Sequence, residues 1–180
     1  MLKITFHPDY DNNKLAKAAT KYQNIWDNEG ERIIKAFNKI AKLDFKEKFI
    51  NAVIFKKGIP HSHPLSLTAD KSYIDKTTIL IHELTHRLIV GNSVKINFSN
   101  KDSHDAKTKD VHKVVNLILY DVWVDLFDKQ VANDRVDFEK NLSTPYKEAW
   151  DWALSFTKDE RAKKFKNLVK NKVNHLEKTS

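Results

Sequence analysis

The stretch Ile79-Leu80-Ile81-His82-Glu83-Leu84-Thr85-His86-Arg87-Leu88-Ile89 places two histidines and a glutamate within an apolar, helically periodic segment. This periodicity predicts a helix from about Tyr73 to Val90, followed by Gly91-Asn92 as a C-cap. Positions i and i+4 of a helix lie about 40° apart around its axis and one turn apart along it. His82 and His86 can therefore reach one metal ion, with Glu83 beside them to accept a proton from water.

The composition limits which ligands such an ion can have. The chain has 180 residues, no Cys, 3 Gly, 4 Pro and a formal charge of +8. Without Cys, a disulfide scaffold and any Cys-ligated zinc or iron–sulfur site are excluded. The ligands must be His, carboxylate or water, and Zn²⁺ is the expected ion because neutral imidazole suits it. Hydrophobic residues at 41%, with ten Phe and four Trp, exclude a disordered chain.

The first residues of the chain and its hydropathy predict where in the cell the protein is located. The first residues, MLKITFHPDYD, lack the long apolar core of a signal peptide. No apolar run approaches the roughly eighteen residues of a membrane span. We therefore expect a cytoplasmic protein without a membrane span. The length fits one domain over residues 1–157, with residues 158–180 as a basic helix packed on it or extending from it.

Most of the positive charge lies in that last segment. Residues 158–180 carry eight Lys/Arg against three Asp/Glu, or +5, which leaves +3 for the other 157 residues. An apolar stripe at helical spacing predicts an amphipathic helix there, formed by Ala162, Phe165, Val169, Val173 and Leu176. We favour a packed helix with a solvated face, since no aromatic residues interleave with the lysines. Binding of nucleic acid or an acidic partner is the less favoured alternative.

The remaining patterns predict an α+β fold with a helical C-terminal part. Leu2 to Phe6 alternates as a strand, and Asp11 or Asn12 caps one long helix that reaches about Ile40, in which Gly30 permits close packing. A helix–turn–helix that breaks at Gly30 is the competing interpretation. Further along, we expect a central strand at 49–55, an edge strand at 62–68, a short strand at 94–98, helices at 111–131, 146–156 and 158–176, and a polar connection at 133–145.

The region from about Phe49 to Asp128 resembles the zincin metallopeptidases, and more narrowly the small gluzincin-like and ImmA/IrrE-type domains. It contains a core strand, an edge strand, the helix with His82, Glu83 and His86, and a following helix. The resemblance implies a small, mostly antiparallel sheet and a zinc hydrolase acting on peptide bonds. It also implies that the following helix supplies the third ligand and that the edge strand, at 65–68, binds an extended substrate.

Catalytic zinc usually has three protein ligands. The candidates after His86 are His104, Asp105, His112, Asp121 and Asp125. His104 and Asp105 fall in a polar segment where solvent exposure is expected. His112 follows His86 by 26 residues, which resembles the position of the Glu ligand in ImmA/IrrE-type proteases, although His replaces Glu. We expect His112, with Asn116 one turn later as a supporting residue, and Asp121 or Asp125 remain the rivals.

These inferences converge on a zinc-dependent metallopeptidase whose substrate is a peptide or protein. His82, His86 and His112 would hold Zn²⁺, and Glu83 would act as the catalytic general base. The alternative is a catalytically silent zincin-like module that binds or regulates through the basic C-terminal helix. The intact Glu83 argues against it, because a structural zinc site needs no general base. These motifs do not determine the cleavage specificity or the oligomeric state.

Overall fold

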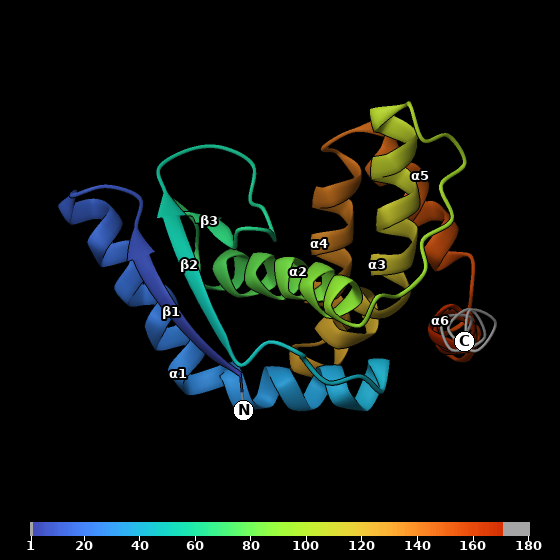
Figure 1. The fold of residues 1–180 in the computed structure, drawn as a ribbon, viewed down its shortest axis with the longest axis horizontal. Helices are drawn as coiled ribbons and strands as arrows, with labels where there is room; N and C mark the ends of the chain where they lie inside the picture. The colour runs from blue at the N-terminus through green and yellow to red at the C-terminus, as the bar shows by residue number, and fades with distance from the viewer. Residues whose placement is uncertain (1, 171–180) are drawn as a thin grey trace, which may run out of the picture. The chain divides into compact units, whose positions relative to one another are not determined.

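The computed structural model describes residues 2–170, and this part of the chain is α+β, as expected (Figure 1). The expected helical residues Val173 and Leu176 lie outside the described residues. The elements, in chain order, are β1 (Lys3–Pro8), α1 (Asn13–Ala41), β2 (Phe49–Phe55), β3 (Ser66–Thr68), α2 (Tyr73–Gly91), α3 (His104–Leu126), α4 (Lys129–Lys140), α5 (Thr144–Leu154) and α6 (Lys158–Lys170).

The chain forms two compact units. The first comprises residues 2–35 and 44–91, with the sheet, most of α1, and α2. The second comprises residues 36–43 and the described residues from 92 onward, with α3 to α6. The expected boundary at residue 157 stays a prediction. None of the helices in the described part of the chain has the length and apolar character needed to cross a bilayer.

The sheet of the first unit is parallel, so the expectation of a mostly antiparallel sheet is wrong. Its order is β1-β2-β3, with Ile4 opposite Ile50 and Ile54 opposite Leu67. The long helix α1 is the crossover that lets β1 and β2 run in the same direction. The segment 56–65 likewise carries the chain back before β3 begins. Alternating apolar residues specify which face of a strand is buried, but not its direction.

Helix α1 is continuous, as predicted, and the competing break at Gly30 is absent from it. The Asn12 side chain caps its start by accepting hydrogen bonds from the backbone N–H groups of Lys14 and Leu15, at 2.9 and 3.2 Å. A Cβ atom on Gly30 would lie 3.0 Å from the Trp26 ring. Gly30 therefore provides the space in which the indole packs.

In the second unit, helix boundaries differ from those expected. Helix α3 begins at His104 instead of Val111, because the Ser103 hydroxyl caps it by accepting from the Ala106 N–H at 3.2 Å. It ends at Leu126, and the segment 94–98 is not a strand.

Helix α4 occupies much of the expected polar connection at 133–145. Asp128 caps it by accepting from the Val131 N–H at 2.8 Å. Its buried face combines Ala132 and Val136 with the polar residues Arg135 and Glu139. This mixture hides the apolar periodicity on which the sequence prediction depended.

The core of the second unit lies between α3 and α5, which run side by side (Figure 1). The Trp123 ring of α3 stacks on the Trp150 ring of α5, with centroids 5.7 Å apart. The indole N–H of Trp150 donates to the Glu139 carboxylate at 2.9 Å. This packing buries much of α3 in the core of the second unit.

Candidate metal centre

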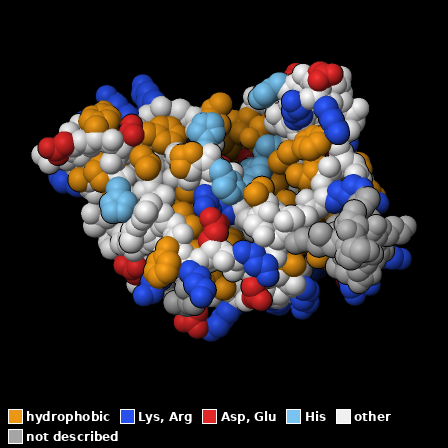
Figure 2. Space-filling view, viewed as in Figure 1, with side chains coloured by type: hydrophobic (Ala, Val, Ile, Leu, Met, Phe, Trp, Pro, Cys, Tyr) orange, Lys and Arg blue, Asp and Glu red, His pale blue; other side chains and the backbone are white. Residues whose placement is uncertain are grey.

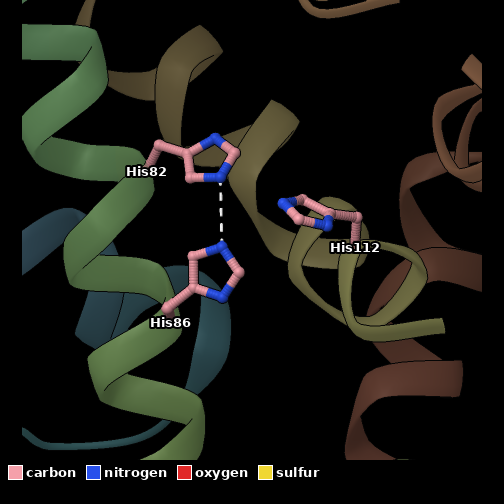
Figure 3. Close-up of side chains that lie close together, drawn as sticks. All are labelled: His82, His86 and His112. Carbon is pink, nitrogen blue, oxygen red and sulfur yellow. Dashed lines mark hydrogen bonds between the residues drawn. The ribbon is translucent and has the colours of Figure 1, made fainter. Parts of the chain in front are cut away.

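Helix α2 places His82 and His86 next to each other. The Ser72 hydroxyl caps the helix by accepting from the Asp75 N–H at 3.1 Å. The segment that follows is buried on most sides, including His82 and Glu83, which are 6% and 8% exposed. The Nε2 atoms of the two histidines lie 3.1 Å apart (Figure 3). The expectation that the i, i+4 spacing brings these imidazoles together is met.

Helix α3 presents His112 in a defined orientation. Its Nδ1 lies 2.7 Å from the carbonyl oxygen of Thr108, one turn earlier, and its ring packs 4.1 Å from the Tyr146 ring, measured between centroids. A carbonyl can only accept, so Nδ1 carries the proton and donates it. The lone pair of His112 is then on Nε2, the arrangement usual in metal-binding histidines.

His82, His86 and His112 form a cluster of potential metal ligands. One ring nitrogen of each histidine lies within 4.8 Å of the others (Figure 3). Nitrogens bound to tetrahedral zinc at about 2.05 Å are about 3.3–3.4 Å apart. The distance of 3.1 Å between the Nε2 atoms of His82 and His86, both on α2, is close to that value. The donor set that this cluster offers is three imidazoles without a thiolate.

The rival carboxylates have other partners. Asp121 accepts two hydrogen bonds from Arg161 of α6, at 3.0 and 2.8 Å, and both side chains are buried. Asp125 forms an ion pair with Lys39. His104 and Asp105 are exposed, at 93% and 82% of their side-chain surface. Among the described residues, the cluster that could hold an ion therefore includes none of these four.

Arg87, which follows His86, fixes the segments around it. Its guanidinium forms a bidentate ion pair with Glu47 and donates to the carbonyl of Ser62. Burial, and then the positive charge of Arg87, lowers the pKa of His63, an effect that Glu47 opposes. Sequence reasoning missed Glu47, which lies in a polar segment without periodicity.

The outer edge of β3 is partly occupied by the chain itself. Ser66 donates to the His61 carbonyl at 2.8 Å and accepts from the His61 N–H at 3.0 Å. The Thr68 carbonyl accepts from the Tyr22 hydroxyl at 3.1 Å. A peptide could add to this edge at Ser66 only after displacing His61. The expected substrate-binding role of residues 65–68 therefore requires movement of the preceding loop.

The three-histidine cluster is the observation on which the function must be argued. Comparison of the chain with protein-family models, with curated proteins and with solved structures gives no match.

Proposed function

We propose that this protein is a zinc-dependent metallopeptidase of the zincin type, which hydrolyses peptide bonds. The observation that carries the proposal is the clustering of ring nitrogens from His82, His86 and His112 within 4.8 Å. Glu83, a buried carboxylate directly after His82 in the sequence, adds the group that hydrolysis requires. A site that only stabilised the fold would not need this carboxylate.

The three imidazoles would hold the ion, and the Thr108 carbonyl fixes the tautomer of His112. Zinc, when bound there, would supply Lewis-acid activation of water and of the scissile carbonyl. Glu83 would accept the proton that the attacking water loses and return it to the leaving amine. Glu83 is 8% exposed, so its carboxylate lies within the protein and is not on its surface.

The test compares the native chain with Glu83→Gln, which keeps the shape of the side chain and removes the base. We expect both proteins to bind near-stoichiometric zinc, and we expect the variant to cleave an unfolded protein substrate about 10²- to 10⁴-fold more slowly. Glu31→Gln, which changes an exposed glutamate on α1, is the matched control and should cleave normally.

Three outcomes would contradict parts of the proposal. Failure of the native chain to bind zinc would remove the metal site. Unchanged cleavage by Glu83→Gln with zinc retained would exclude Glu83 as the base. Zinc binding by a native chain that cleaves no peptide bond would favour the catalytically silent module.

A further inference from the structure

The second unit contains a cavity with an unusual concentration of positive charge. Its volume is about 690 Å³, and its lining consists of Lys95, Ile96, Asn97, Phe98, Lys101 and Lys107. Three of these side chains carry an ammonium group, and none of the described residues that line the cavity is acidic. In Figure 2, blue Lys and Arg side chains and red Asp and Glu side chains both stand in the region where α3 begins.

The loop that forms this cavity is fastened to α3. The buried carboxylate of Asp110 accepts hydrogen bonds from the backbone N–H and the hydroxyl of Ser99, at 2.6 and 2.7 Å. The Asn100 side chain accepts from the Asp102 N–H at 2.9 Å, and Ser103 caps the helix. Hydrogen bonds therefore fix the loop that carries Lys95 and Lys101 at several positions.

The nearby acidic groups are not part of the lining. Asp110 is engaged by Ser99 and by Lys113, and Lys109 pairs with Glu148 at 3.0 Å. Asp102 and Asp105 belong to the same segment, but neither lines the cavity. The cavity thus offers three cations and two apolar side chains, including the Phe98 ring, which is 39% exposed.

We propose that this cavity binds an acidic segment of a peptide. Carboxylates of Asp or Glu would pair with the ammonium groups, and neighbouring apolar side chains would contact Ile96 and Phe98. Lys107 precedes His112 by five residues on α3, which is about 7.5 Å along the axis and about 140° around it. This inference rests on the proposed peptidase function, for which the cavity would select acidic substrates.

A peptide fits the lining better than a nucleic acid does. The lining consists of three lysines, an asparagine and two apolar side chains. It includes one aromatic ring, whereas single-stranded nucleic acid sites stack successive bases on several rings.

The experiment measures binding of two fluorescent peptides that differ only in having Glu or Gln at the acidic positions. The protein is the full chain with Glu83→Gln, with and without zinc, so that cleavage cannot remove the probe. We expect tighter binding of the Glu peptide, weakened by salt. Lys95→Gln, Lys101→Gln and Lys107→Gln should each reduce that affinity by up to about fivefold. Lys166→Gln, an exposed lysine of α6, is the matched control and should not reduce it.

Equal binding of the Glu and Gln peptides would overturn the inference, as would an equal loss in Lys166→Gln. A single-stranded oligonucleotide of matched charge that binds the cavity more tightly than the Glu peptide would overturn the peptide assignment. Because peptide binding is measured without turnover, a protein that binds no zinc but still prefers the Glu peptide contradicts only the proposed function. Zinc binding and cleavage by the native chain, combined with equal binding of the two peptides by Glu83→Gln, contradict only this inference.

Discussion

His112 and Thr108 show how one backbone carbonyl can prepare a metal ligand. The carbonyl holds the Nδ1 proton of His112 at a donor–acceptor distance of 2.7 Å. Because a neutral imidazole has one proton, this hydrogen bond leaves the Nε2 lone pair for a metal. The Nε2 atoms of His82 and His86 lie 3.1 Å apart, and which of them donates depends on the tautomers of the two rings.

Asp121 is predicted to stabilise the fold instead of binding metal. Its carboxylate is buried and receives two hydrogen bonds from the buried Arg161. Asp121→Asn leaves that guanidinium charge uncompensated, and removing one partner of a buried pair costs about 3–5 kcal/mol. Urea denaturation should show this loss of unfolding free energy, while zinc affinity of the folded protein stays close to that of the native chain. A stable variant that loses zinc would instead make Asp121 a ligand.

At the residue scale, the sequence could identify the histidines but not the ion pairs. His82 and His86 are separated by one helical turn, and that separation alone determines their proximity once the helix forms. The pairs Arg87–Glu47 and Arg161–Asp121 join residues about 40 positions apart. Such contacts follow from tertiary packing and leave no periodic signal in the sequence.

Gly30 provides a test of packing within α1. Gly30→Ala gains about 1 kcal/mol of helix propensity, but its Cβ atom would lie 3.0 Å from the Trp26 ring. Trp26 is buried, so the ring cannot easily move, and overpacking typically costs about 1–3 kcal/mol. We expect a net loss of up to about 2 kcal/mol in unfolding free energy, measured with urea. Asn28→Ala, at an exposed position of the same helix, should be neutral or stabilising, and a stabilised Gly30→Ala would contradict the packing argument.

Asp110 anchors the loop before α3, and its contribution should depend on pH. Burial opposes its charged form, but hydrogen bonds from Ser99 and the charge of Lys113 outweigh it, so its pKa is lowered from 3.8. Because the folded-state pKa lies below the unfolded value, the stabilisation is complete above about pH 4 and is lost as pH falls through the folded pKa.

Urea denaturation of the native chain and Asp110→Asn between about pH 6 and about pH 3 measures this dependence. The stability difference between the two proteins should shrink toward the acidic end. Asp102→Asn changes an exposed carboxylate of the same segment and serves as the control. A difference that stays constant over this range would show that the Asp110 charge does not anchor the loop.

Whether a segment forms a helix or a strand was easier to predict than the direction of a strand or the ends of a helix. The continuous apolar stripe of α1 determined one helix across Gly30, since a break would have shifted its phase. Strand direction depends on the connections, and nothing in the alternation of β1 indicated that α1 would act as a crossover. Helix α4 was missed because Arg135 and Glu139 lie on its buried face, where the sequence method expects apolar residues.

At the scale of the whole molecule, most of the net charge lies in a different segment of the chain from the three histidines. Much of the +8 belongs to residues 158–180, whereas the three histidines lie on α2 and α3. In α6, Arg161 and Phe165 are buried, and the exposed lysines lie around them. The overall charge therefore gives little information about the histidine cluster. Metal binding to the cluster can instead be followed through the thermal stability of the chain.

Zinc should stabilise the whole chain through its three histidines. A ligand that binds only the folded state adds RT ln(1 + [L]/Kd), or about 2.7 kcal/mol at a hundredfold excess over Kd. We expect calorimetry to show a higher Tm with zinc and its reversal by a chelator. The increase should shrink in acid, because protons compete with the metal for imidazole nitrogens. His112→Ala should abolish most of the increase, while His104→Ala, at an exposed residue on the same helix, should retain it. An equal increase in both variants would mean that zinc binds outside this cluster, since the loss of one of three ligands must weaken binding at the site it helps to form.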